Sequence, residues 1–354
     1  MIWVTWRHHR SSIVAALGTI VVLALAAVVA GRIVTADPSA RGFGTFFYCF
    51  GSTPGVCRAE SVLTATTVIA AALPVLFGLL VGVTVFSRDI EQGTHVLGLS
   101  QSVSRARWFW MRILVVFLPI SALMTVLGFI LEWTRSYGGA KSGAFISGSG
   151  IGLSRLTFPL FQSSGLVLGT NTLLAPIIGS AAALIVRNTL GAMVITLIAT
   201  VAIMVGLQLG ARPHYAPPSI DARPLSGAAA YASSGNTGFW FDSWTIGSDY
   251  VDAGGNAVDI DQQHCARAIY SDDDFGQRPD ETYADYNART EILYQEQQRD
   301  YETCLRTQGA DHFEVRYHAD NRFRQFQLTE TALVLLIAAA FLVPARWGLR
   351  RLRP

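Results

Sequence analysis

The chain has 354 residues, of which 51% are hydrophobic and only 15% are charged. A water-soluble domain carries about 25% charged residues, so a large part of this chain is expected to face lipid. The formal net charge of +2 averages two unlike regions. The segment from Arg212 to Leu328 holds 19 of the 25 acidic residues and 10 arginines, which leaves it near −9, while the remainder is near +11. Such segregation indicates that the two regions lie in different compartments.

Apolar runs long enough to cross a membrane occur six times. A helix needs roughly 20 apolar residues to span a hydrocarbon core of about 30 Å. The runs are Ile13–Val34, Val62–Phe86, Phe109–Leu131, Gly165–Val186, Thr189–Gly210 and Thr329–Val343. They predict an all-α polytopic membrane protein with six transmembrane helices. Five of the helices fall within residues 13–210 and the sixth lies at 329–345.

The distribution of arginine predicts the orientation, because short cytoplasmic loops carry an excess of basic residues. With the N-terminus in the cytoplasm, residues 1–12, 87–108 and 346–354 and the short Arg187-Asn188 link are cytoplasmic. These pieces contain Arg7, Arg10, Arg88, Arg105, Arg107, Arg187, Arg346, Arg350, Arg351 and Arg353. The sequence therefore predicts a multi-pass protein of the plasma membrane with both termini in the cytoplasm and a basic tail at 346–354.

Residues 1–12 predict a short interfacial helix. Trp3, Trp6, Arg7 and Arg10 repeat at three-to-four-residue spacing, which is typical of aromatic anchors and arginines that reach toward the headgroups. The alternative is a plain basic flank that only fixes the topology.

The long acidic segment, residues 211–328, is predicted to be a small extracytoplasmic α+β domain between transmembrane helices 5 and 6. Its first part, up to Asn256, is rich in Pro, Gly and Ser and is expected to be mainly loop. A helix is expected over Glu281–Arg306. Phe313, Val315 and Tyr317 alternate as in a strand.

All four cysteines fall in segments predicted to lie outside the cell. An oxidising compartment favours disulfides, and pairing between nearest neighbours gives Cys49–Cys57 and Cys265–Cys304. Cross-pairing remains the alternative. The spacing of Cys49 and Cys57 is not that of a metal site, and no metal site is predicted.

Signatures of catalysis and of an internal energy source are missing from the sequence. It contains no P-loop, no H-E-x-x-H zinc motif and no G-x-S-x-G nucleophile elbow, whose residues are needed to wrap phosphate, bind zinc or present a serine. Glu132 and Glu330 stand at the ends of spans, where a hydrated rim is expected. No catalytic residue and no cofactor of this chain are predicted.

Pairs of glycines four residues apart recur inside the spans, at Gly78 and Gly82, at Gly165 and Gly169, and at Gly206 and Gly210. Such pairs allow close approach of helices in a membrane. We interpret all three as packing positions.

Four motifs carry a resemblance to a known family. They are the opening Trp3-x-Thr5-Trp6-Arg7-x-His9-Arg10, the polar stretch Arg88-Asp89-Ile90-Glu91-Gln92-Gly93-Thr94-His95, the following Ser100-Gln101-Ser102-Val103-Ser104-Arg105, and Arg322-Phe323-x-x-Phe326-Gln327-x-x-Glu330. Together they resemble the permeases of the ABC-2 (type-2 ABC exporter) family of actinobacteria. Arg324 departs from the aromatic residue that this family carries there.

The resemblance implies a transmembrane permease subunit with six helices and no enzymatic activity of its own. It implies separate ABC ATPase subunits that bind ATP and Mg, and a second permease copy or a paralogue that completes a dimer. It also implies that the loop 87–108 couples to the ATPase through Arg88, Asp89, Glu91, Gln92, Gly93, Thr94 and His95. These polar side chains can make charge-assisted hydrogen bonds to a partner. A hydrated turn held by a local Arg88/Glu91 pair is the plainer alternative.

Two functions follow. The first is an ATP-driven exporter that moves a hydrophobic or amphipathic compound, such as a drug, a lipid or a peptide-like molecule, outward. The second is a membrane sensor or scaffold whose outer domain binds a ligand or a protein. Membrane lipid is an expected partner and nucleic acid is not.

Overall fold

The computed structural model describes residues 2–36, 54–92, 104–137, 154–225, 243–267 and 275–351. The chain divides into two compact units. Met1–Ala216 and Asp320–Pro354 form a helical unit, and Pro217–Ala319 form a sheet unit. Each unit has a hydrophobic core of its own.

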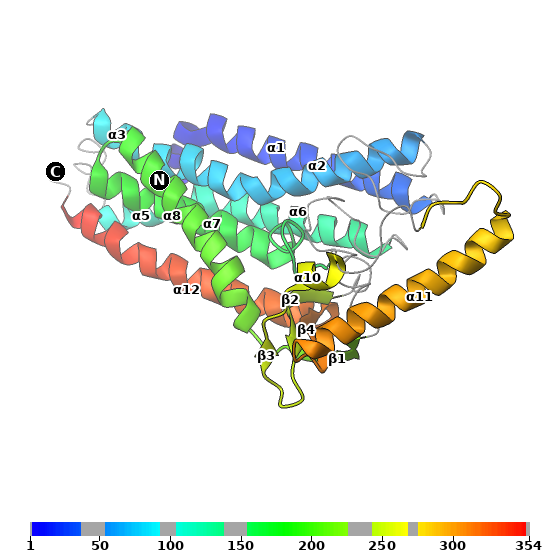
Figure 1. Ribbon diagram of the computed structural model, residues 1–354. Helices are drawn as coiled ribbons and strands as arrows, with labels where there is room; N and C mark the ends of the chain where they lie inside the picture. The colour runs from blue at the N-terminus through cyan, green and yellow to red at the C-terminus, as the bar shows by residue number, and fades with distance from the viewer. Residues whose placement is uncertain are drawn as a thin grey trace. The chain divides into compact units, whose positions relative to one another are not determined.

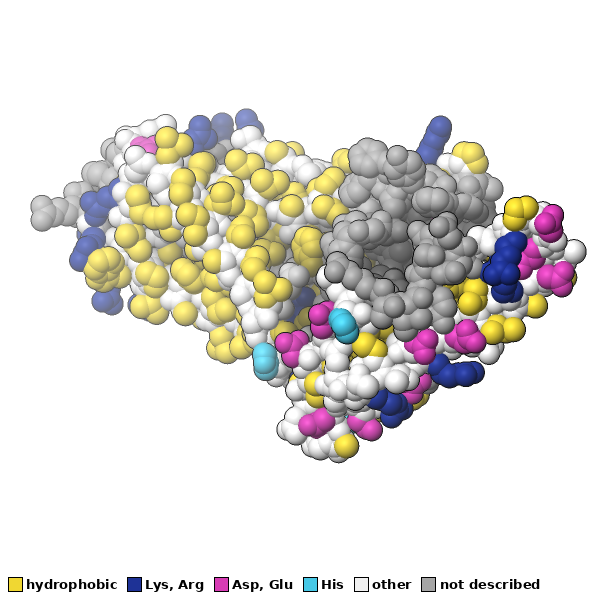
Figure 2. Space-filling model, viewed as in Figure 1, with side chains coloured by type: hydrophobic (Ala, Val, Ile, Leu, Met, Phe, Trp, Pro, Cys, Tyr) yellow, Lys and Arg dark blue, Asp and Glu magenta, His cyan; other side chains and the backbone are white. Residues whose placement is uncertain are grey.

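Six continuous helical stretches of the helical unit are long and apolar enough to cross a membrane: Arg10–Ala36, Pro54–Glu91, Arg105–Thr134, Gly165–Val186, Thr189–His214 and Asp320–Arg350. Hydrophobic side chains are spread over the flanks of these helices (Figure 2). A surface of this kind is stable only in an apolar solvent. The prediction of a polytopic helical membrane protein is confirmed.

The six stretches are built from these elements (Figure 1): α1 (Ile2–Ala36); α2 (Pro54–Phe77), η1 (Gly78–Val83) and α3 (Thr84–Glu91); α5 (Arg105–Arg112), η2 (Ile113–Phe117) and α6 (Leu118–Tyr137); α7 (Gly165–Val186); α8 (Thr189–Gly206), η3 (Leu207–Ala211) and η4 (Arg212–His214); and η7 (Asp320–Arg322) and α12 (Phe323–Arg350). The segments η1, η2 and η3 are π-helical turns inside longer helices.

Several helices are longer than the apolar runs that predicted them. α12 begins at Phe323 rather than at 329, because Phe323 and Phe326 are buried and the Phe323 ring packs edge-on against Phe161 at 5.7 Å. α1 is continuous from Ile2, so residues 1–12 are not a separate helix. The residues at the span ends are polar and basic, so a search for apolar runs does not include them. Their backbones nevertheless continue the helical hydrogen bonding.

α7 lies at the centre of the helical unit. It packs against α12, α6, η1, α8 and α2. In an apolar stretch of 18 residues in this helix, 78% is buried, compared with 22% in the corresponding stretches of the spans that contain α8 and α12. Its sequence is rich in Gly and Ala, which let neighbouring backbones approach closely within a membrane.

Two of the three predicted glycine pairs lie at such close approaches. A Cβ atom on Gly82 would come within 2.5 Å of the Cα of Pro176, and one on Gly78 within 2.9 Å of the Cβ of Ala175. A Cβ on Gly169 would overlap the Thr125 side chain. Gly206 and Gly210, in contrast, have open space where a Cβ would stand, with no atom of the described chain within 4 Å of it. This third pair therefore makes no packing contact within the described residues.

We expect Gly82→Ala to lower the free energy of unfolding by about 1–3 kcal/mol, because the methyl group meets the Pro176 backbone and forces η1 and α7 apart. Gly206→Ala is the matched control and should leave the stability within about 0.5 kcal/mol of wild type. Both are measured by denaturant titration of the purified protein in detergent. Equal stability of the two variants would contradict the close packing of α7.

In its described residues, the sheet unit contains four antiparallel strands in the order β1-β4-β2-β3, namely β1 (Ser219–Pro224), β2 (Ser243–Val251), β3 (Ala257–Val258) and β4 (His312–Ala319). Two helices accompany it, α10 (Gln262–Arg267) and α11 (Tyr283–Thr307). Its core includes Leu225, Tyr250, Leu305, Phe313 and Val315. The expected helix and the expected strand at Phe313–Tyr317 correspond to α11 and β4.

The expectation that residues up to Asn256 are mainly loop is wrong for β1 and β2. Both strands pair along β4, from Ser219 opposite Tyr317 and from Ser243 opposite Ala319. Their Ser, Pro and Gly content lowers the local strand preference, but the central position of β4 supplies hydrogen-bonding partners on both of its edges.

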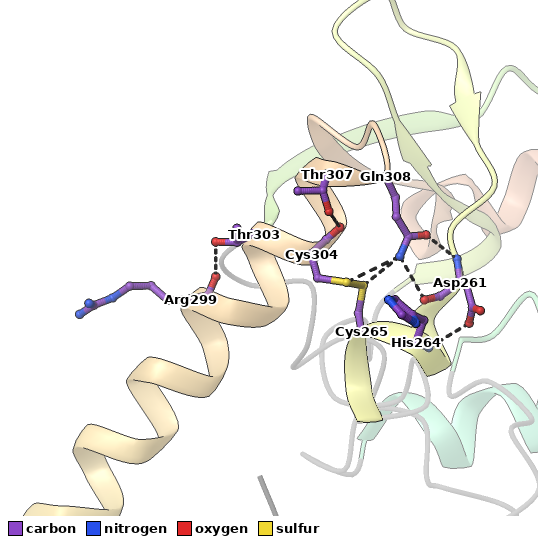
Figure 3. The surroundings of a disulfide bond; sticks show 8 residues. All are labelled: Asp261, His264, Cys265, Arg299, Thr303, Cys304, Thr307 and Gln308. Carbon is purple, nitrogen blue, oxygen red and sulfur yellow. Dashed lines mark hydrogen bonds between the residues drawn. A yellow bond between two sulfur atoms is a disulfide. The ribbon is translucent and has the colours of Figure 1, made fainter. Parts of the chain in front are cut away.

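A disulfide joins Cys265 of α10 to Cys304 of α11 (Figure 3), which confirms this predicted pairing. Gln308 reinforces the link: its side-chain NH₂ donates to the Cys265 sulfur at 3.0 Å, and its side-chain oxygen accepts from the Asp261 backbone N–H at 2.8 Å. The two helices are therefore held together covalently and by a polar clamp. Cys49 lies outside the described residues, and the Cys49–Cys57 pairing stays a prediction.

The double variant Cys265→Ser with Cys304→Ser should lower the free energy of unfolding of the sheet unit by about 4 kcal/mol, because the link closes a long loop in the unfolded chain. Amide hydrogen exchange of β4 and α11, measured on the full chain in detergent, reports this loss. Wild type treated with a reductant should behave like the variant. Wild-type protection in both samples would show that the disulfide does not support the unit.

Candidate functional site: the arginine-rich end of the helical unit

Four segments distant in sequence meet at one end of the helical unit, which we call the arginine-rich end. The Thr189 backbone N–H donates to the Glu91 carboxylate at 2.8 Å, joining the start of α8 to the end of α3. The Arg105 guanidinium donates to the carbonyl of Arg350 at 3.0 Å, joining α5 to the end of α12. Figure 1 shows α3, α5 and the C-terminal end of α12 on the same side.

Asp89 and Arg112 form a buried ion pair between α3 and α5, with both side chains only 9% exposed. The Arg112 guanidinium also donates to the carbonyl of Val85. Both charges lie inside the spans Pro54–Glu91 and Arg105–Thr134. Since an unpaired charge in such a position is costly, the pair fixes the distance between the two helix ends.

Aromatic rings enclose this ion pair. The Arg112 guanidinium lies 4.1 Å from the centre of the Trp108 ring and 5.4 Å from that of Phe86. Phe86 and Trp108 meet edge to face at 5.4 Å. The stacked rings exclude water from the guanidinium, which strengthens its interaction with Asp89.

The structure corrects the expectation of a loop over the whole of 87–108. Ser87 to Glu91 continue the second transmembrane stretch as part of α3, and Arg105 to Trp108 belong to α5. Asp89 is buried rather than presented to a partner. The residues between Gln92 and Ser104 lie outside the described part of the chain.

Glu91 is engaged within the helical unit. Its side chain accepts from the Thr189 N–H and so helps to cap α8, together with Asn188, whose side chain accepts from the Gly191 N–H at 2.9 Å. In the described part of the chain, Arg88 and Glu91 do not form the local ion pair that the sequence left open.

What remains accessible is a short polar surface at the end of α3. Arg88, Glu91 and Gln92 are exposed, and Gln92 ends the helix with its N–H donating to the carbonyl of Arg88 at 3.0 Å. Gly93, Thr94 and His95 lie outside the described residues. The surface lies at the end of the continuous helical stretch Pro54–Glu91, which the Asp89–Arg112 pair connects to α5.

The predicted membrane anchors form the first turns of α1. Trp3 is 65% and Trp6 is 41% exposed, and Arg7 and Arg10 are exposed as well. The Arg7 guanidinium lies 5.1 Å from the centre of the Trp3 ring. This is an amphipathic arrangement suited to a membrane boundary.

A second buried ion pair lies at the opposite end of the helical unit, and it corrects the expectation of a hydrated rim at Glu330. Two nitrogen atoms of Arg212 donate to the two carboxylate oxygens of Glu330 at 2.9 and 2.8 Å. Arg212 is fully buried and Glu330 is 2% exposed. The guanidinium also donates to the Leu156 carbonyl at 3.2 Å and lies 4.0 Å from the centre of the Phe161 ring.

Neighbouring groups extend this cluster. The Tyr215 hydroxyl donates to Glu330 at 3.4 Å, and burial next to that carboxylate raises the pKa of the Tyr215 phenol above its usual value. Glu132 was also expected at a hydrated rim, but its side chain is 15% exposed and pairs with Arg324 at 3.0 Å. Arg324, which replaces an aromatic residue of the resembled family, therefore has a local partner.

Sequence reasoning missed Arg112 and Arg212. Arg112 lies inside the predicted span Phe109–Leu131, and a charge in such a run is itself a signal of a buried partner. Arg212 follows the fifth apolar run directly, and 118 residues separate it from Glu330, so no sequence spacing connects them.

Within the described residues, no group of three or more His, Cys, Asp or Glu is arranged to hold a metal ion.

Among the described residues, six helical stretches are able to cross a membrane, and four of the others pack against the closely packed α7. Together with the polar helix end at the arginine-rich end, this is typical of the membrane subunit of a transporter. A family model described as "ABC-2 membrane transporter related" matches residues 16–212, more than half of the 354-residue chain. The chain belongs to this family and is an ABC transporter permease. Membership of this family implies ATPase partner subunits in general. No curated protein and no solved structure matches the chain.

Arg212→Gln should lower the free energy of unfolding by roughly 3–5 kcal/mol, because it leaves the Glu330 carboxylate buried without a counter-charge. The control is Arg324→Gln. The Arg324 side chain is 63% exposed, so the loss of its pair with Glu132 should cost about 1 kcal/mol or less.

The double variant Arg212→Leu with Glu330→Leu removes both charges and should recover most of the loss. All variants are compared by denaturant titration in detergent. If Arg212→Gln and Arg324→Gln have the same stability, the buried pair does not hold the helix ends.

Proposed function

We propose that this permease exports a hydrophobic or amphipathic compound, driven by ATP that separate ATPase subunits hydrolyse at the arginine-rich end. In this proposal the exposed end of α3, with Arg88, Glu91 and Gln92, and the following Gly93, Thr94 and His95 form the coupling element. ATP and Mg bind to the partner chain.

The observation that carries the proposal is the rigid connection behind the exposed end of α3. The Asp89–Arg112 pair joins α3 to α5, and the contact between Glu91 and Thr189 joins α3 to α8. A force applied to Arg88 therefore acts on three transmembrane stretches together. A hydrated turn without such connections would bend instead of moving the helices.

The proposed orientation puts the arginine-rich end and both termini in the cytoplasm. The exposed Arg88, Arg107, Arg346 and Arg350 gather at this end, in agreement with the excess of basic residues on the cytoplasmic side of membrane proteins. The acidic sheet unit then follows the fifth stretch into an oxidising compartment, where the Cys265–Cys304 disulfide is stable.

A second permease copy or a paralogue is proposed to complete the transport path. α8 supports this proposal, because its apolar side chains Leu190, Val194 and Ile198 are more than half exposed. Gly206 and Gly210 add a stretch where another backbone can approach. The same face can also contact lipid. A measurement of the oligomeric state in a membrane distinguishes a second permease copy from lipid at this face.

Arg88→Glu tests the coupling assignment more cleanly than a change at Glu91, which also caps α8. We expect the variant to fold and insert like wild type, since Arg88 is exposed. It should weaken binding of the ATPase subunit by roughly ten- to a hundredfold, because a charge-assisted contact is replaced by a like-charge clash. Co-purification with the ATPase and substrate-stimulated ATP hydrolysis are the measurements.

Arg10→Glu is the matched control, because Arg10 is an exposed arginine on α1 at the same end. This variant should retain both ATPase binding and substrate-stimulated ATP hydrolysis. Loss of ATPase binding in both variants would mean that net positive charge, and not the end of α3, mediates the contact. If neither variant changes the ATPase, the coupling assignment is wrong, and an ATPase-independent sensor becomes the better explanation.

A further inference from the structure

A pocket of about 170 Å³ opens between α5 and α12 at the arginine-rich end. This is space for several water molecules, or for one small polar headgroup. Its lining includes Arg105, Phe109, Trp110, Arg346, Leu349 and Arg350.

Three arginines give the pocket one polar, positively charged side. Arg346 and Arg350 are one helical turn apart on α12, so their side chains share a face, and both are exposed. The half-buried Arg105 approaches from α5, where its bond to the Arg350 carbonyl holds it in place. Among the described residues no carboxylate lines the pocket, and none forms an ion pair with these three guanidinium groups.

The other side of the pocket is apolar. Phe109 and Leu349 are 1% and 5% exposed and close its inner wall, while Trp110 is 40% exposed at its edge. Exposed apolar side chains then continue away from the pocket along both helices, with Leu114 on η2 and Val343 on α12 at 52% and 69% exposure. A ligand that pairs with the arginines and also covers the apolar side chains has an anionic group next to an apolar chain.

The position of the pocket fits the same ligand. Arg105 and Arg350 are the end residues of the spans Arg105–Thr134 and Asp320–Arg350, so the arginines stand where the hydrocarbon core meets the headgroups. Tryptophan is enriched at this depth, and Trp110 and Trp347 are both partly exposed there. Trp347 is covered by Arg351, whose guanidinium lies 3.4 Å from its ring centre, outside the pocket.

We propose that this pocket binds the phosphodiester headgroup of an anionic phospholipid, with an acyl chain against the exposed apolar side chains Leu114 and Val343. Basic pockets between transmembrane helices at the membrane surface select anionic headgroups. Guanidinium groups are suited to phosphate because they donate two parallel hydrogen bonds. The lipid joins α5 to α12 from outside and supplements the single bond between Arg105 and Arg350. This inference does not depend on the proposed transport activity or on the direction of transport.

The test is lipid binding by the full chain in detergent, with phosphatidylglycerol and phosphatidylcholine titrated separately and bound lipid counted by native mass spectrometry. We expect phosphatidylglycerol to bind in preference to phosphatidylcholine. Arg346→Gln with Arg350→Gln should weaken phosphatidylglycerol binding by roughly thirtyfold, since each basic residue near an anionic surface contributes about fivefold. Arg105 is left unchanged because it also holds α12.

Arg107→Gln is the matched control and should bind lipid like wild type. Arg107 is an exposed arginine of α5, the helix that carries Arg105, but it does not line the pocket. Arg346→Lys with Arg350→Lys keeps the charge and should retain most of the affinity. A melting temperature near that of wild type shows that the glutamine variant is folded. If the glutamine variant is not folded, the lysine variant and Arg107→Gln remain as tests. The lysine variant should still bind phosphatidylglycerol in preference to phosphatidylcholine, and Arg107→Gln should bind both lipids as wild type does.

Glycerophosphate added at the same concentration as phosphatidylglycerol separates a lipid from a free phosphate. Failure of glycerophosphate to displace phosphatidylglycerol supports the lipid, because the acyl chain contributes to its binding. Full displacement at equal concentration would overturn the choice of a lipid in favour of a soluble phosphate. Equal binding of the two phospholipids, or equal loss in the Arg107→Gln control, would overturn the pocket as a specific site.

Discussion

The helical unit depends on the close approach of α7 to its neighbours. No hydrophobic effect drives helices together inside a bilayer, so van der Waals contact between backbones has to supply much of the attraction. Gly82 meets Pro176 and Gly78 meets Ala175 along η1, and a Cβ atom on Gly179 would come within 2.6 Å of the Gly78 carbonyl oxygen. At the far end of α7, Leu184 meets Gly348 of α12 in the same way. The other helices are arranged around this axis.

Once α7 is fixed, two buried ion pairs fix the helix ends. Asp89–Arg112 lies at the arginine-rich end and Arg212–Glu330 at the opposite end. Buried pairs contribute little net stability compared with apolar side chains of the same volume, but either partner alone is strongly destabilising. Their effect is therefore on specificity, because any register of the helices that separates the partners is excluded. In a permease the Asp89–Arg112 pair keeps the polar end of α3 in a defined position relative to α5.

The arginine-rich end combines two surfaces of different chemistry. The end of α3 is polar and mixed in charge, which suits a protein partner, while the pocket between α5 and α12 has a basic side and an apolar side, which suits a lipid. Both rest on the same framework, since α5 takes part in the Asp89–Arg112 pair and in the bond from Arg105 to α12. A ligand that tightens α5 against α12 therefore acts on the helix that positions the exposed end of α3.

The sequence by itself determined the membrane class, the six helices and the helix and strand of the sheet unit around Cys304 and Phe313, because these follow from the length of apolar runs and from local periodicity. It also indicated the Cys265–Cys304 pairing through compartment and spacing. Only the tertiary structure decided that Asp89 is buried and that Glu91 caps α8, since both depend on Arg112 and Thr189, which are distant in the chain. The same holds for β1 and β2, which β4 stabilises against their own composition, and for Arg212 and Glu330. A charged residue at the end of an apolar run looks hydrated until a partner 118 residues away is brought against it, and only folding brings it there.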